Sequence, residues 1–356
     1  MLINSNKQCL LQPFYNHQPV YQDRYRFFCV HNACCQALLF YNIPHANLYL
    51  NCVVDLTLFF DASETILPFH IQMDTSPFLD SNCFNFSLCK HDEDMKDVWE
   101  SNKRTINLGT PLIIGVDRYY LPYHRHYQKL HGAHAVFLCG YDEIQHQVFL
   151  LDSDRNGIYR GAVDINVINQ ARLSENSWNG NINSGGNIKG ASLEIILNEF
   201  HDSPEVLLRR TVKNMLVSYF ENILDHSQTL TGRTAMQYIY QWYTGQKKPE
   251  ESERGQYFMD LYAILLPVYA KKTLFLNYLK DAITLCHTIP SMEVALTCAK
   301  QCVDLWKTFY QVLLKLAHRK VFSNVLYQDS ITLFKKSIAR ENELGFYLDE
   351  MNRQLR

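Results

Sequence analysis

The stretch HGAHAVFLCGYDEIQHQVFLLD, residues 131–152, predicts two buried strands joined by a short turn. Its parts HAVFLCGYD (134–142) and QVFLLD (147–152) are near-continuous apolar runs, which are typical of strands buried on both faces. The four residues between them, EIQH, form a largely polar segment with the length of a hairpin connection, so we expect the two strands to pair antiparallel. Such pairing sets the start of one strand beside the end of the next, and it therefore predicts that His134 lies close to Asp152.

The rest of the chain divides into three segments by its sequence character. Residues 1–172 mix short helical and extended segments, as in the expected strand TPLIIGVD (110–117), and form an α+β domain. Residues 173–190 are rich in Asn, Ser and Gly, and they are either a surface linker or a mobile flap over a site. Residues 191–356 are expected to be helical.

The clearest helical pattern lies within SMEVALTCAKQCVDLWKTFYQVLLKLAHR (291–319). Apolar residues recur there at spacings of three and four, which predicts one buried face of a long helix. The members of that face are Ala295, Cys298, Ala299, Cys302, Trp306, Phe309, Leu313 and Leu316. The two cysteines are therefore expected in a hydrophobic core and not at a metal.

Composition limits the classes of partner. The chain has 356 residues, of which 47% are hydrophobic and 20% charged, and its formal net charge is −2. This balance argues against nucleic acid or an anionic membrane surface as the main partner. We find no secretory signal and no apolar run near the roughly 20 residues of a membrane span. The 11 cysteines are an odd number, which favours free thiols and the reducing cytoplasm.

One cysteine of RYRFFCVHNACCQALLFYN (24–42) is placed to act as a nucleophile. A buried helical stripe through Val30, Cys34, Ala37, Leu38 and Tyr41 accounts for Cys34 as a core residue. Cys29 lies about 140° from Cys34 around the helix, at the position where the helix would begin. Free backbone N–H groups and the helix dipole stabilise a thiolate at such a position, so Cys29 is the best candidate nucleophile.

A thiolate nucleophile needs a base, and the base needs a partner that orients it. His134 and Asp152 supply such a pair on two rigid strands, which predicts a Cys-His-Asp site with Cys29. The rival interpretation is metal binding, because His124, His126 and His131 crowd next to His134. That pattern is weak for zinc, since no acidic or thiol ligand lies at a suitable spacing.

These residues also resemble a known family. GTPLIIGVDRYYLPYHRHYQKLHGAHAVFLCGYDEIQHQVFLLDSD (109–154) is similar to the signature of the butirosin-biosynthesis H-protein family, and CVHNACCQALLFYN (29–42) is similar to its opening segment. The resemblance implies a papain-like cysteine-peptidase fold, with an N-terminal helix, an antiparallel sheet and, in this chain, a C-terminal all-helical region. It also implies that Cys29 is the nucleophile, His134 the general base and Asp152 its orienting carboxylate.

The resemblance implies an acyltransferase or amide synthase of natural-product assembly in the bacterial cytoplasm. Such an enzyme holds no cofactor of its own; it takes an acyl group from the phosphopantetheine thioester of an acyl or peptidyl carrier protein and passes it to an amine. Carrier proteins are usually acidic, so their docking needs a local basic surface. The candidates are Lys247, Lys248, Arg209 and Arg210. A homodimer is left open.

Five further residues are expected to contact substrate. They are Gln22, Asn32, Tyr119, Tyr120 and Tyr123. The tyrosines would form a wall that excludes water, although Tyr119 and Tyr120 could equally be packing residues. Two other functions remain open: a cysteine peptidase or amidase that uses water with the same three catalytic residues, and a binding module in which these residues no longer act.

Overall fold

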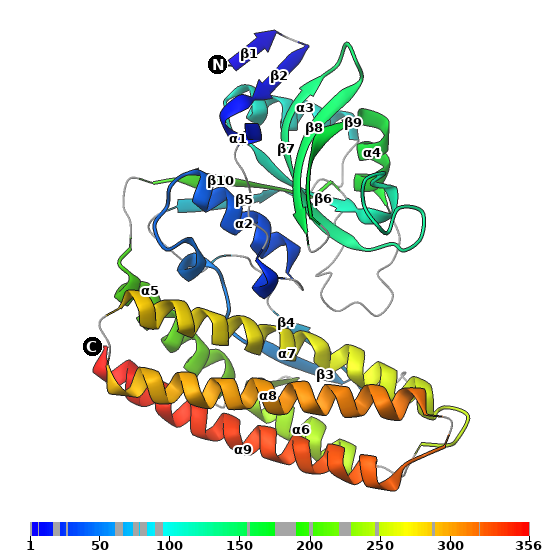
Figure 1. Ribbon diagram of the computed structural model, residues 1–356, viewed down its shortest axis with the longest axis vertical. Coiled ribbons are helices and arrows are strands. Elements are labelled where there is room, and N and C mark those ends of the chain that lie inside the picture. Colours follow the sequence, from blue (N-terminus) through cyan, green and yellow to red (C-terminus); the bar gives the residue numbers. More distant parts are fainter. Residues whose placement is uncertain are drawn as a thin grey trace. The chain divides into compact units, whose positions relative to one another are not determined.

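A computed structural model shows two compact units, which we describe separately (Figure 1). The first comprises residues 1–50, 77–179 and 184–202, and the second comprises residues 51–76, 180–183 and 203–356. The structure describes residues 2–5, 7–16, 22–25, 28–60, 67–73, 78, 84–89, 95–154, 157–174, 190–198, 202–220, 229–245, 249–286, 289–319 and 321–355. The expected linker or flap at 173–190 lies outside these residues except for positions 173, 174 and 190.

The first unit is built on an antiparallel sheet. Its strands are β1 (Leu2–Ser5), β2 (Gln8–Leu11), β5 (Phe84–Cys89), β6 (Leu112–Asp117), β7 (Ala133–Asp142), β8 (Gln147–Asp154), β9 (Gly157–Asp164) and β10 (Ser192–Leu197). Among the described residues they run in the order β1-β2-β7-β6-β10-β5, while β8 pairs with β7 and β9 pairs with β8. The predicted hairpin is confirmed, because β7 and β8 pair antiparallel from Asp142 with Gln147 back to Phe137 with Leu151.

Helices and short turns complete this unit. They are α1 (Gln12–Asn16), η1 (Asp23–Tyr25), α2 (Cys29–Phe40), η2 (Ala46–Tyr49), α3 (Met95–Asn107), η3 (Arg118–Tyr120) and α4 (Ile165–Leu173). Helix α2 packs on β7 and β8, and every residue from His31 to Leu38 is buried. The expected stripe is right for Cys34 but wrong for Val30, which is 37% exposed because the first turn of α2 opens to solvent beside the half-buried Cys29.

Strand β7 lies at the centre of the sheet and is buried along almost its whole length. It pairs with β8 along one edge and with β6 and then β2 along the other. At Gly140 the backbone of β2 comes very close to β7, since a Cβ on Gly140 would stand 2.4 Å from the carbonyl oxygen of Cys9. A glycine at this position therefore lets the N-terminal strand join the sheet.

The second unit is mainly helical. Its elements are β3 (Leu56–Phe60), β4 (Phe69–Met73), α5 (Pro204–Met215), the π-helical turn η4 (Leu216–Phe220), β11 (Thr229–Thr231), α6 (Gly232–Gly245), α7 (Arg254–Leu285), α8 (Pro290–His318) and α9 (Asn324–Gln354). The long helix expected within 291–319 is confirmed as α8, and all eight residues predicted on its apolar face are buried.

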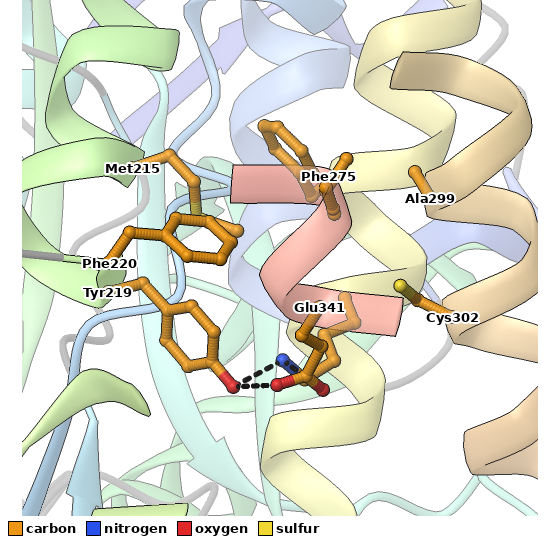
Figure 2. Close-up of a pocket in the computed structure, with 9 residues that line it drawn as sticks. Met215, Tyr219, Phe220, Phe275, Ala299, Cys302 and Glu341 are labelled. Atoms are coloured by element: carbon orange, nitrogen blue, oxygen red, sulfur yellow. Dashed lines mark hydrogen bonds and ion pairs between the residues drawn. The ribbon is translucent and has the colours of Figure 1, made fainter. Parts of the chain in front are cut away.

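The helical unit contains a buried charged cluster beside a small pocket (Figure 2). Lys272 Nζ lies 3.0 Å from Glu341 Oε1 and 2.7 Å from the hydroxyl of Tyr219, which donates to Glu341 Oε2 at 2.5 Å. Trp306 Nε1 donates to Glu341 Oε1 at 2.6 Å. The pocket leaves room for about one water molecule. Because the ionic groups satisfy one another, we interpret this cluster as part of the core.

The expected α+β class is confirmed, whereas the chain does not follow the expected order of segments. The prediction of helix from residue 191 onward is wrong for β10, which pairs with β6 and β5 in the first unit. In the second unit, β3 pairs antiparallel with β11 along one edge and with β4 along the other. Strand pairing is non-local, so a chain can return to an earlier sheet without any change of local composition. No helix in the described part of the chain is both long and apolar enough to span a membrane.

Candidate active site

Cys29 is the first residue of helix α2, as the sequence predicts. Phe28 precedes it without a side-chain cap, and the carbonyl of Phe28 accepts from the N–H of Asn32. The first N–H groups of an α-helix have no partner within the helix, and the N–H of Cys29 is one of them. A half-buried thiol at this position lies in the positive end of the helix dipole, where negative charge is stabilised.

His134 and Asp152 form a buried pair at one end of the β7–β8 hairpin. The His134 Nε2 atom lies 3.0 Å from Oδ1 and 2.9 Å from Oδ2 of Asp152. His134 is 8% exposed and Asp152 is 4% exposed, so bulk water screens their interaction only weakly. The hairpin register explains this proximity, because it sets the start of β7 beside the end of β8.

The thiol of Cys29 lies close enough to His134 to influence the pKa of the imidazole. Burial by itself lowers the pKa of His134, but the charge and hydrogen bonds of Asp152 and the hydrogen bond with Cys29 outweigh it. The pKa of His134 is therefore raised well above its usual value, which favours the imidazolium. Because Nε2 faces Asp152, Nδ1 is the ring nitrogen left for Cys29. This order of groups can move a proton between the thiol and the imidazole.

Tyr123 contacts the carboxylate of this row. Its hydroxyl donates to Asp152 Oδ2 at 3.1 Å, and its ring stacks on Tyr159 of β9 with centroids 3.6 Å apart and an angle of 4° between the planes. The sequence predicts Tyr123 in a wall against substrate, and the structure brings its hydroxyl to Asp152.

Asn32 lies one helical turn after Cys29 and is tied to strand β8. Its Nδ2 donates to the carbonyl oxygen of Ser153 at 3.1 Å and to the hydroxyl of Ser153 at 3.0 Å. Its Oδ1 is buried and has no hydrogen-bond partner within the described part of the chain. The amide nitrogen of Asn32 thus joins the start of α2 to the residue that follows Asp152, and the expected contact of Asn32 with substrate stays a prediction.

Tyr119 and Tyr120 belong to a neighbouring cluster around Asp117. The Asp117 carboxylate is fully buried and accepts from the backbone N–H groups of Tyr119 and Gly132 at 3.0 and 3.1 Å. His131 Nδ1 lies 2.7 Å from its Oδ2, and the ring of Tyr119 stacks on His131 at 3.9 Å. Tyr120 packs edge-on against Tyr119, with centroids 5.1 Å apart. These ring contacts favour the interpretation of Tyr119 and Tyr120 as packing residues.

The Asp117 carboxylate also accepts from the hydroxyl of Ser174 at 2.6 Å. Burial raises the pKa of Asp117, but hydrogen bonds from Ser174, the N–H of Tyr119, His131 and the N–H of Gly132 outweigh it and lower the pKa. Asp117 therefore stays ionised and fixes the turn that leads into β7. It anchors the chain just ahead of His134.

Gln22 contacts the thiol of Cys35 and not that of Cys29. Its Nε2 donates to the Cys35 Sγ at 3.5 Å, and the Cys35 thiol in turn donates to Asn47 Oδ1 at 3.1 Å. Asn47 Oδ1 also accepts from the hydroxyl of Tyr25 at 2.7 Å. This chain of contacts holds η1 and η2 against α2. That Gln22 contacts substrate stays a prediction, and its contact with Cys35 does not support it.

The crowded histidines have separate partners. His124 Nδ1 accepts from the N–H of His126 at 3.2 Å, and its ring lies 5.4 Å from that of His134. His126 Nε2 accepts from Arg125 Nε at 2.9 Å. Within the described ranges, no group of three or more His, Cys, Asp or Glu side chains is arranged to hold a metal ion.

Sequence reasoning missed Tyr159 and Ser153 as neighbours of the site. Ser153 directly follows Asp152, and its contact with Asn32 joins residues 121 positions apart. Tyr159 lies on a strand whose exposed face gives no sign of function. A search for partners of Asp152 on the strand beside β8 would have found Tyr159, because β8 and β9 pair with Asp152 opposite Tyr159.

Residues 83–153 match the family model described as "Butirosin biosynthesis protein H, N-terminal". The resemblance stated from the sequence is confirmed over this segment. The match includes Tyr123, His134 and Asp152, whereas Cys29 precedes it. A comparison with curated proteins finds no match.

Proposed function

We propose that this chain is a cysteine-dependent acyltransferase that forms an amide in the biosynthesis of a natural product. The observation that supports the proposal most is the position of His134, between the carboxylate of Asp152 and the thiol of Cys29. The match of residues 83–153 to the butirosin-biosynthesis family supports the biosynthetic role. We assign Cys29 as nucleophile, His134 as acid and base, and Asp152 as the group that orients the imidazole.

In the first step the thiolate of Cys29 attacks the carbonyl carbon of a thioester. The N–H of Cys29, at the start of α2, is the donor that we assign to the developing oxyanion. As the tetrahedral intermediate collapses, the new bond to Cys29 Sγ stays and the bond to the donor sulfur breaks. His134 gives its proton to the departing thiolate. Exchange between two thiols costs little free energy, so this loading step is easy.

In the second step a primary amine attacks the acyl-enzyme. His134, now neutral, takes the proton of the amine, and the Cys29 thiolate leaves as the amide forms. Water in place of the amine would give a carboxylic acid, so the choice between synthesis and hydrolysis depends on which acceptor reaches the acyl-enzyme. A peptidase or amidase that uses the same residues is the competing outcome.

We propose that the acyl group arrives on the phosphopantetheine of a carrier protein, with no cofactor resident in the chain. A basic segment next to the site supports this partner. Residues 118–131 contain Arg118, Arg125 and Lys129 and no Asp or Glu. Arg125 and Lys129 are exposed and have no ion pair with a described carboxylate. Such a segment complements an acidic carrier.

Two of the basic residues considered earlier, Lys247 and Lys248, lie outside the described residues. The other pair, Arg209 and Arg210, lies on α5 in the helical unit. A cytoplasmic location stays a proposal. It is supported by the nine cysteines whose side chains the structure describes, which are all free thiols, as expected in a reducing compartment.

The first test is selective alkylation. We would treat the protein with limiting iodoacetamide between about pH 5 and 8 and map the modified cysteines by peptide mass spectrometry, because only an activated thiolate reacts well below the usual thiol pKa of about 8.5. We expect Cys29 to be labelled first, and to lose that advantage in His134→Ala. Equal labelling of Cys29 and the buried thiols would refute the assignment.

The second test identifies the acceptor. A panel of acyl-pantetheine thioesters is offered with and without primary amines, and the products are separated by mass spectrometry. Amide products that disappear in Cys29→Ser support the transferase. Free acid as the sole product, also dependent on Cys29, would favour the hydrolase.

A further inference from the structure

The carboxylate of Asp152 has two hydrogen-bond donors, and the second is a tyrosine on the segment between β6 and β7. His134 Nε2 lies within 3.0 Å of both carboxylate oxygens, and the Tyr123 hydroxyl donates to Oδ2 at 3.1 Å. With one donor alone, a carboxylate can rotate about its Cβ–Cγ bond. A second donor from a different direction restricts this rotation and stabilises the charged form.

The ring of Tyr123 is held by a second tyrosine. Tyr159 stacks on it with centroids 3.6 Å apart and an angle of 4°, so the two rings are almost parallel. Tyr159 is fixed in turn by its own hydroxyl, which donates to the carbonyl oxygen of Ala162 at 3.0 Å. The stack therefore sets the direction in which the hydroxyl of Tyr123 points.

A glycine makes room for this arrangement. Tyr159 and Gly161 lie on the same face of β9, because side chains two residues apart share a face. A Cβ at Gly161 would stand 2.6 Å from the Tyr159 hydroxyl and 2.7 Å from its Cζ. The ring of Tyr159 thus covers the backbone of Gly161. It occupies space that the side chain of any other residue at position 161 would need.

We infer that Tyr123, held by its stack on Tyr159, is a positioning residue for Asp152 and does not form part of the substrate wall. It acts through the carboxylate on the orientation of His134, and so on the state of the Cys29 thiol. This inference rests on the proposed function, since it assigns a role to Asp152 in a thiolate site. It replaces the substrate contact that the sequence suggested for Tyr123.

The test compares Tyr123→Phe with Tyr141→Phe. The first variant keeps the ring and its stack but loses the hydrogen bond to Asp152. Tyr141→Phe is the matched control, because Tyr141 is a tyrosine whose hydroxyl likewise donates to a side-chain oxygen, Asn107 Oδ1 at 2.9 Å, near the opposite end of β7. Tyr159→Leu removes the stack but keeps the hydroxyl of Tyr123, and it serves as a second test.

The first measurement is the rate of Cys29 alkylation at about pH 6 relative to about pH 8. In Tyr123→Phe we expect this ratio to fall about tenfold, the effect of one hydrogen bond to a charged group. Tyr159→Leu should change the ratio in the same direction, and Tyr141→Phe should match the wild type. A wild-type ratio in Tyr123→Phe would overturn the inference.

The second measurement separates positioning from substrate binding. With a pantetheine thioester and an amine, Tyr123→Phe should lower kcat with little change in KM, because the substrate does not touch the lost hydroxyl. A raised KM at constant kcat would show that Tyr123 contacts substrate and would overturn the inference. If the wild type shows an activated Cys29 but no acyl transfer, the proposed reaction fails, whereas the alkylation ratios still decide the role of Tyr123. If wild-type Cys29 is not activated at all, both fail.

Discussion

Asp152→Asn removes one negative charge from the proposed site while it keeps an oxygen that can accept from His134. The lost charge lies 2.9–3.0 Å from Nε2 in a pair that is almost fully buried. Charge-assisted hydrogen bonds of this kind contribute about 1.5–3 kcal/mol. At about 1.4 kcal/mol per factor of ten, the imidazolium becomes about 10- to 150-fold less favoured. Burial, which lowers the pKa of His134, then dominates.

The assay is the pH dependence of Cys29 alkylation. Without an imidazolium beside the thiol, the rate at about pH 6 should fall at least about tenfold, and it should recover towards about pH 8.5 as an ordinary thiol ionises. Asp142→Asn is the control, because Asp142 ends β7 at the turn, at the opposite end of the hairpin from His134. An unchanged rate at pH 6 in Asp152→Asn would refute the idea that Asp152 maintains the imidazolium.

Unfolding gives an independent measurement of the same pair. Because the folded-state pKa of His134 is raised above its unfolded value, protonated His134 adds stability that is fully present below about pH 6.5. This stability is lost as the pH rises through the folded-state pKa. Asp152→Asn should remove the effect, so its free energy of unfolding should fall less than that of the wild type between about pH 6 and 9. Parallel curves for the two proteins would contradict this reasoning.

Two further predictions concern charged groups outside the proposed triad. Glu341→Gln leaves Lys272 buried without a counter-charge, so the free energy of unfolding measured in urea should fall by about 3–5 kcal/mol; a loss below about 1 kcal/mol would mean that the pair contributes little to stability. Charge reversal in Arg125→Glu with Lys129→Glu should raise KM for a carrier-bound thioester several-fold, with no change for a free pantetheine thioester. Arg104→Glu, on α3 beside the opposite end of β7, is the matched control. Equal effects on both donors would contradict docking on this segment.

Local patterns were sufficient wherever partners lie close in sequence. The hairpin of β7 and β8 was predictable, and with it the contact of His134 with Asp152, because a short turn fixes the strand register. The start of a helix at Cys29 and the apolar face of α8 were predictable for the same kind of reason, since helical periodicity is a property of neighbouring residues.

The proximity of Cys29 to His134 and Asp152 was a hypothesis that helical periodicity alone could not test. Asn32 and Ser153, whose contact joins α2 to β8, are 121 residues apart and carry no pattern that links them. Tyr123 was identified as a residue of interest, but its role was not, because a tyrosine offers both a ring and a hydroxyl. The role depends on what the hydroxyl and the ring each contact. The hydroxyl contacts Asp152 on β8, and the ring contacts Tyr159 on β9.

The sequence by itself therefore determined the hairpin, the helix that begins at Cys29 and the apolar face of α8, and it predicted the three proposed catalytic residues. Tertiary structure decided that β10 returns to the first sheet, that Gln22 contacts Cys35, and that Tyr123 reaches Asp152 through a stack on Tyr159. The physical reason is the range of the interactions. Hydrophobic periodicity and turns act between near neighbours, whereas strand pairing and side-chain contacts depend on how distant segments pack together.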